Sequence, residues 1–158
     1  MLAFLTQPRT LWILFVVFIA ETLAFGVVML TWNFEIIDEM SDPVRIQHHI
    51  EAMSATQRTV HAWMTATLDV AYPLTYGPLF IGVALRTLPR AAALPALAVI
   101  PLDLAEGAVQ VLALTGTLEW LWLKAYLTPL KLILFGAAIV IALTALMVGW
   151  HAARKSNP

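Results

Sequence analysis

Two carboxylic acids on one side of a predicted helix have the clearest potential for chemistry. Asp103 and Glu106 stand three residues apart, and Gln110 follows four residues later in a stretch that is otherwise apolar. Helical spacing places the three side chains on one face. When two carboxyl groups lie close together, their repulsion keeps a proton on one of them, so that one can act as an acid and the other as a base. Such a pair can support acid–base chemistry or bind a cation.

Polar side chains interrupt three further apolar segments. Asp69 is followed by two tyrosines at the same helical spacing, which puts a carboxylate and two phenols on one face. In the last apolar segment, Lys124, Thr128 and Lys131 form a polar stripe, and the first segment contains one acid. We expect these stripes to converge on one interior site. Its candidate ligand-binding residues are Glu21, Asp69, Tyr72, Tyr76, Asp103, Glu106 and Lys131.

The segments that position these residues are each long enough to cross a bilayer as a helix, which takes about 20 mostly apolar residues. The chain of 158 residues is 61% hydrophobic and only 12% charged, whereas soluble proteins have about 25% charged residues. The four segments cover residues 11–32, 63–85, 91–114 and 125–150. We therefore predict an all-α fold, in which residues 1–158 form a single integral membrane domain, a bundle of four transmembrane helices.

Charges in the connections predict how this domain lies in the membrane. Basic residues favour the cytoplasmic side. They precede the first segment, separate the second from the third and follow the fourth, at Arg9, Arg86, Arg90, Arg154 and Lys155. Both termini are therefore expected on the cytoplasmic side. The first segment is too long for the apolar core of a signal peptide and contains Glu21, so we expect it to be retained.

The connection at residues 33–59 is predicted to lie outside and to contain a short amphipathic helix. The residues Ser41-Asp42-Pro43 have the types found at a helix start, with a capping side chain and a proline in the first turn. Apolar residues then recur at helical spacing, at Ile46, Ile50 and Met53. Ser54 and Gln57 match a capping box that would open the next helix.

Membrane depth makes every ionisable group costly, and the predicted site is rich in acids. Four of its members are carboxylic acids and only Lys131 is an amine. Full ionisation would leave about three negative charges uncompensated in a low dielectric. We therefore expect protonated carboxyl groups or a bound cation, with Lys131 paired to Glu106 or Asp103.

Several classes of function lack their usual residues. The chain has no cysteine, which excludes disulfides, thiol catalysis and thiolate metal sites. Its formal net charge of −1 does not favour a nucleic-acid partner. The histidines of the first half, His48, His49 and His61, lie in or beside the outer loop, so we expect neither haem ligation nor another cofactor, and no metal site.

The acidic, tyrosine and lysine motifs resemble those of a group of small, uncharacterised bacterial four-helix membrane proteins. The resemblance covers the second to fourth segments and rests on Asp69, Tyr72, Pro73, Tyr76, Asp103, Glu106 and Lys131. Members of the group usually have asparagine after the glutamate, where this chain has Gly107. The resemblance implies a bacterial cytoplasmic (inner) membrane. A looser likeness, in architecture and acid placement alone, is to EXPERA-type proteins.

Three functions fit this pattern, and the sequence leaves them open. The first is a membrane protein without enzymatic activity, whose acidic, tyrosine and lysine cluster binds a small lipophilic or cationic ligand. The second is an accessory subunit that packs in the lipid bilayer against a larger membrane complex, to which a homo-oligomer is a separate alternative. The third is an intramembrane enzyme of the isomerase type that uses the paired carboxyls.

Overall fold

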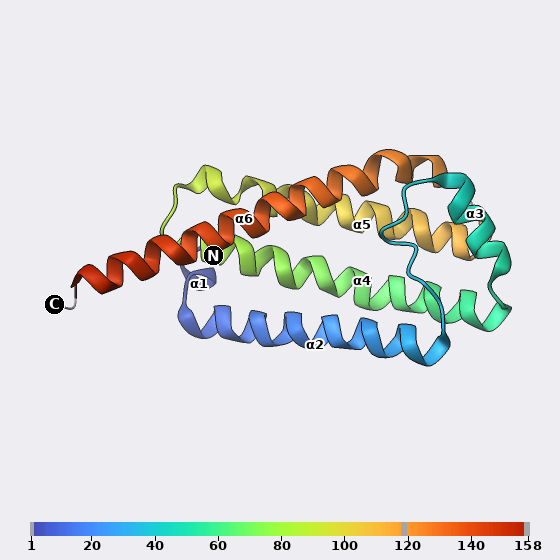
Figure 1. Cartoon of the computed structure of the whole chain (residues 1–158), viewed down its shortest axis with the longest axis horizontal. Coiled ribbons are helices and arrows are strands. Elements are labelled where there is room, and N and C mark those ends of the chain that lie inside the picture. Colours follow the sequence, from blue (N-terminus) through green and yellow to red (C-terminus); the bar gives the residue numbers. More distant parts are fainter. Residues whose placement is uncertain (1, 118–119, 157–158) are drawn as a thin grey trace.

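Four long helices lie alongside one another, and the short helices and the longest loop gather at their ends (Figure 1). The computed structural model describes residues 2–117 and 120–156, and within these ranges the secondary structure is entirely helical. The elements in chain order are α1 (Leu2–Leu5), α2 (Pro8–Trp32), α3 (Pro43–Ala52), α4 (Ala55–Ala84), η1 (Arg90–Ala93), α5 (Leu94–Leu114), η2 (Leu121–Leu123) and α6 (Lys124–Ser156). The prediction of an all-α fold is confirmed.

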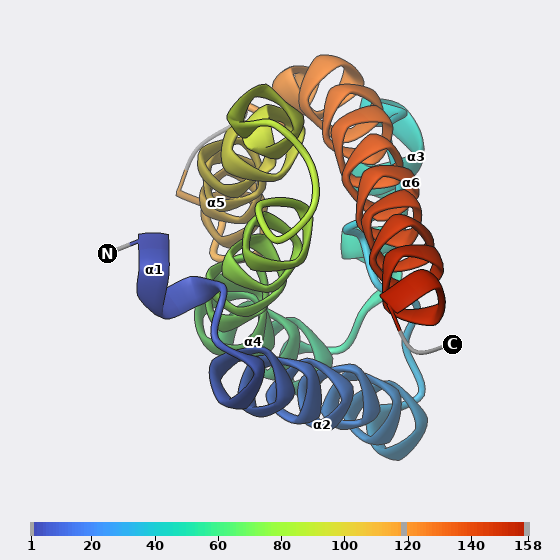
Figure 2. The ribbon, with the colours of Figure 1, turned by 90° about the vertical axis from the view of Figure 1, so that its left-hand side faces the viewer.

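Among the residues that the structure describes, three stretches are long and apolar enough to cross a membrane: Pro8–Trp32, Arg90–Leu114 and Leu121–Lys155. They correspond to α2, to η1 with α5, and to η2 with α6. These stretches have the character of an integral membrane protein. The helix α4 is as long as the others but more polar, and its position explains why. It packs against α2, α5 and α6 (Figure 2), so protein rather than lipid covers many of its polar side chains.

The helix α4 begins earlier than predicted, at Ala55 rather than near residue 63. Its start is fixed by the capping box, since the Gln57 amide N–H donates to the Ser54 Oγ at 3.2 Å and the Ser54 N–H donates to the Gln57 Oε1 at 3.0 Å. The Gln57 side chain also donates to the carbonyl oxygens of Trp32 and Asn33, at the end of α2. The predicted capping box is confirmed, and it ties two helix ends together.

We expect Ser54→Ala to lower the free energy of unfolding by about 1 kcal/mol, because the first turn of α4 loses a hydroxyl acceptor. Denaturant titration in detergent, followed by circular dichroism, measures this change. The Ser54→Thr variant keeps the hydroxyl and should unfold close to the wild type. Equal losses in the two variants would contradict a capping role.

The short helix α3 covers one end of the long helices. The Asp42 Oδ1 accepts from the Val44 N–H at 3.0 Å, so the predicted helix start is confirmed. On the inner face of α3, Ile46 and Ile50 are buried. They join an apolar cluster with residues from the preceding loop, α4, α5 and η2, namely Phe34, Ile37, Met53, Met64, Leu114 and Leu121. The amphipathic helix is therefore part of the core at this end.

At the opposite end, α1 folds back against α4 at a glycine (Figure 2). A Cβ atom at Gly82 would overlap the carbonyl oxygen of Leu5 and would lie 2.7 Å from the Cδ2 atom of Leu11. Any larger residue would push α1 and the start of α2 away from α4. Glycine at this position therefore permits the close approach.

Candidate functional site

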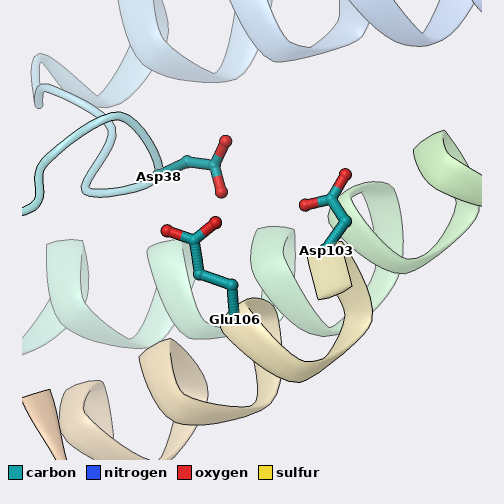
Figure 3. A group of neighbouring side chains, drawn as sticks. All are labelled: Asp38, Asp103 and Glu106. Atoms are coloured by element: carbon teal, nitrogen blue, oxygen red, sulfur yellow. The ribbon is translucent and has the colours of Figure 1, made fainter. Parts of the chain in front are cut away.

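The side chain of Lys131 on α6 lies among three carboxylates. Its Nζ atom is 2.7 Å from the Asp38 Oδ1, 2.6 Å from the Glu106 Oε2 and 3.3 Å from the Asp103 Oδ1. Figure 3 shows the three carboxyl groups turned toward one another, two from α5 and one from the loop before α3. The predicted pairing of Lys131 with Glu106 and Asp103 is present.

The third carboxylate comes from a part of the chain that the sequence did not single out. Asp38 lies in the loop between α2 and α3, and this loop reaches inward so that Asp38 meets Lys131. Five acids lie within residues 33–51, and four of them, at positions 35, 38, 39 and 42, share helical spacing, so the pattern does not distinguish Asp38 from its neighbours. Its pairing with Lys131 follows only from the path of the loop in the structure.

A second buried amine changes the charge balance that we expected. Lys124 at the start of α6 is fully buried and pairs with the Glu106 Oε1. It also donates to the Gln110 Oε1 at 3.2 Å, while Thr128 donates to Glu106. We expected Lys131 to be the only amine of the site, and this prediction was wrong. The stripe of Lys124, Thr128 and Lys131 was the available signal, because it puts both amines on one helix face.

Gln110 extends the network to a histidine that we had placed beside the loop. The Gln110 Nε2 donates to the Thr65 Oγ1 at 2.9 Å and lies 3.2 Å from the His61 Nε2. His61 is fully buried and stacks on Phe34, with ring centroids 4.7 Å apart. His61 precedes the predicted span, and the loop covers it.

Two of the predicted site residues, Glu21 and Tyr72, bond instead across the contact between α2 and α4. The Thr75 hydroxyl donates to the Glu21 Oε1 at 3.1 Å. The Tyr72 hydroxyl lies 3.1 Å from the Thr22 Oγ1, and its ring stacks on Phe18. The structure therefore does not bring Glu21 and Tyr72 together with Lys131. By contrast, Tyr76 is buried and donates to the Asp103 Oδ2 at 2.7 Å.

Asp69 is the least satisfied member of the site. It is 8% exposed, and it has no hydrogen bond or ion pair to any residue that the structure describes. Its Oδ2 atom faces Gly107 on α5, where a Cβ atom would lie 3.8 Å away. The charges of Asp38, Asp103 and Lys131 all act on it. Asp69 thus adds a fourth carboxyl to a cluster that contains two amines.

Asp38, Asp103 and Glu106 can each offer an oxygen to a metal ion, with the three oxygens within 4.8 Å of one another. In this structure the Lys131 ammonium lies between them and is within 3.3 Å of all three. The amine supplies the positive charge that a metal ion would bring. The triad is therefore best described as an ion-pair cluster around a lysine.

Aromatic rings continue the site toward the opposite end of the helices. Tyr72, Tyr76 and Phe80 form a row along α4, each ring in contact with the next. Rings from both neighbours also contact this row: Phe18 and Phe25 from α2, and Phe135 from α6. Both α2 and α6 pack against α4, while extensive packing of α2 on α6 is absent from the described residues. The row is thus covered at Tyr76, which is 1% exposed, while Tyr72 and Phe80 are partly exposed.

The sequence matches no protein-family model, and comparison with curated proteins and with solved structures found no match. The geometry and charge of the site therefore carry the functional argument.

Proposed function

We propose that this chain is a membrane protein with four spans that binds a small lipophilic cation in the space flanked by α2, α4 and α6. The helix α4 is the fourth span in this proposal, and Asp69 is the principal counter-charge. The membrane is the cytoplasmic (inner) membrane of a bacterium, as the resemblance implies. Asp69 carries the proposal because an ionised carboxyl that is buried without a partner costs several kcal/mol.

The charge balance supports a cationic ligand. Asp38, Asp103 and Glu106 pair with Lys131, and Glu106 also pairs with Lys124, so three carboxyls already share two amines. Asp69 faces the same cluster and has no described partner. A bound cation, or a proton when the cation leaves, would complete the balance.

The aromatic row supports the lipophilic part of the ligand. Cations bind favourably over aromatic faces, by about 2 kcal/mol where water is excluded. Asp69 and the rings of Tyr72 and Tyr76 lie on the same side of α4. Tyr72 and Phe80 are partly exposed, so a molecule dissolved in the bilayer can approach the row at these two rings.

The proposed orientation has both termini on the cytoplasmic side. The connection between α4 and η1, which contains Arg86, lies at the same end of the molecule as both termini, and α3 lies at the other (Figure 1). A hydrogen bond of 3.0 Å from the Thr87 hydroxyl to the Ala145 carbonyl oxygen holds this connection against α6. The basic connections thus gather at one end and the acidic loop at the other, which is the distribution of a helical protein with its basic side inside.

Binding of tetraphenylphosphonium to the full chain in lipid nanodiscs tests the proposal, with tetraphenylborate as an anion of the same shape. We expect saturable binding of the cation alone. We expect Asp69→Asn to weaken it at least tenfold, which corresponds to about 1.4 kcal/mol. The melting temperature should change little, because the amide keeps the size of the carboxyl. Equilibrium dialysis gives the affinity.

Glu39→Gln is the matched control, since Glu39 is an exposed acid in the loop next to Asp38. It should bind the cation as the wild type does. Equal binding by Asp69→Asn and the wild type would contradict the proposal, as would equal uptake of the cation and the anion. The accessory-subunit and isomerase hypotheses remain predictions, and no contact among the described residues favours either of them.

A further inference from the structure

A groove of about 1340 Å³ lies at the α3 end of the molecule, between α3, the first turns of α4, the end of α5 and η2. It is separate from the acidic cluster. On α4 its lining follows one helix face, at Ala55, Arg58, Thr59, Ala62, Trp63 and Ala66. The neighbouring face of α4 holds His61, Thr65 and Asp69, which point into the network described above. The two sites therefore use different sides of the same helix.

One end of the groove has two opposite charges that are not paired with each other. Arg58 is partly exposed, and its side chain has no hydrogen bond or ion pair to any described residue. Glu51 on α3 accepts from the Gln47 side chain at 2.7 Å and lies 3.9 Å from His48, with more than half of its side chain exposed. A guanidinium and a carboxylate are therefore both available within one groove.

Another part of the groove is lined by apolar side chains. Ala62 and Ala66 on α4 face Val111 and Leu114 on α5, so small side chains leave room between the two helices. Trp63 and Trp122 line the groove and are 68% and 57% exposed. Indole rings settle at the boundary between lipid headgroups and hydrocarbon. The lining of the groove thus combines charged side chains with apolar ones.

We propose that this groove binds one phospholipid whose headgroup carries a primary ammonium, such as phosphatidylethanolamine. Arg58 binds the phosphodiester, Glu51 binds the ammonium, and an acyl chain lies along Ala62 and Ala66. A guanidinium binds phosphate oxygens through charge-assisted hydrogen bonds, and a primary ammonium has three N–H donors for a carboxylate. The inference rests on the proposed orientation, which places the groove in the outer leaflet, but it does not depend on the ligand at Asp69.

Native mass spectrometry of the full chain, titrated in detergent with lipids of identical acyl chains, tests the inference. The lipids are phosphatidylethanolamine and phosphatidylcholine, whose headgroup lacks N–H donors. We expect the wild type to bind one phosphatidylethanolamine about tenfold more tightly than phosphatidylcholine, because only the ammonium of phosphatidylethanolamine donates hydrogen bonds to the Glu51 carboxylate. Arg58→Gln should lose at least tenfold in affinity for both lipids. Glu51→Gln should lose only the preference.

Arg45→Gln is the control, because Arg45 is exposed on α3 and does not line the groove. It should bind lipid as the wild type does. Equal affinity of the wild type for the two lipids would overturn the headgroup assignment, and unchanged binding by Arg58→Gln would overturn the groove. Both variants replace partly exposed side chains, and their melting temperatures report whether they are folded.

The orientation is tested separately, in intact cells that express the chain. The chain has no cysteine, so Thr56→Cys near the groove and Lys155→Cys at the other end can each be labelled alone. A maleimide that does not cross membranes should react with the first from outside and not with the second. The reverse pattern would overturn the outer-leaflet assignment while leaving the lipid affinities as measured. Tetraphenylphosphonium binding by Arg58→Gln should match the wild type, which separates this site from the one at Asp69.

Discussion

Replacing Glu106 with alanine is expected to lower the free energy of unfolding by about 3–5 kcal/mol, the cost of breaking a buried ion pair on one side. Glu106 is fully buried and joins the two buried amines, with Lys124 on one oxygen and Lys131 on the other. Its loss leaves Lys124 without a carboxylate among the described residues. Unfolding by sodium dodecyl sulfate in mixed micelles, followed by circular dichroism, measures the change.

A double-mutant cycle distinguishes an ion pair from simple loss of packing. The combined variant Glu106→Met, Lys124→Met removes both charges and keeps much of the volume, so it should unfold closer to the wild type than either single variant. Glu39→Ala removes an exposed acid and should change stability by less than about 0.5 kcal/mol. A loss below about 1 kcal/mol in Glu106→Ala would contradict a buried pair, because exposed pairs contribute that little.

Gly82→Ala is expected to destabilise the fold by about 1–3 kcal/mol, the usual cost of adding an atom to a packed contact. The added Cβ would overlap the Leu5 carbonyl oxygen, and a backbone atom cannot rotate away as a side chain can. We therefore expect α1 to separate from α4 while the long helices stay packed. Thermal unfolding gives the loss of stability, and hydrogen exchange at residues 2–7 reports the separation.

Gly136 on α6 offers a matched control, because a Cβ atom there would have no neighbour within 4 Å. Alanine is a better helix former than glycine by about 1 kcal/mol, so Gly136→Ala should leave stability unchanged or raise it. If Gly82→Ala behaved like Gly136→Ala, the close approach of α1 to α4 would be contradicted.

Local signals in the sequence predicted the helices well. The four apolar segments predicted the four long helices, and the Asp42 and Ser54 caps identified two helix starts. The boundary of α4 was missed by about two turns because hydropathy was used to find it. Its first turns contain Gln57, Arg58 and His61, which are polar but helical. Capping chemistry marked the true start, and hydropathy marked only the apolar part.

The members of the site were harder to predict. The sequence indicates how far along a helix a residue lies, but it does not indicate which neighbouring helix the side chain faces. Glu21 has the depth of the cluster, yet it faces Thr75 on the side of α4 next to α2. Tyr72 likewise faces Thr22. The acids around Asp38 have helical spacing, but the structure has a loop there, so the inward path of Asp38 depends on tertiary packing that no local pattern encodes.

The contact between Asp38 and Lys131 has a consequence for biogenesis. The two residues are 93 positions apart, and α6 is synthesised after the loop and after α2, α4 and α5. Until α6 is inserted, Asp38, Asp103 and Glu106 have neither of their amines, and these acids must remain hydrated or protonated. Packing of α6 therefore brings both amines to these acids and docks the loop in the same step, so the end of the molecule that α3 covers matures only after the last long helix has taken its place.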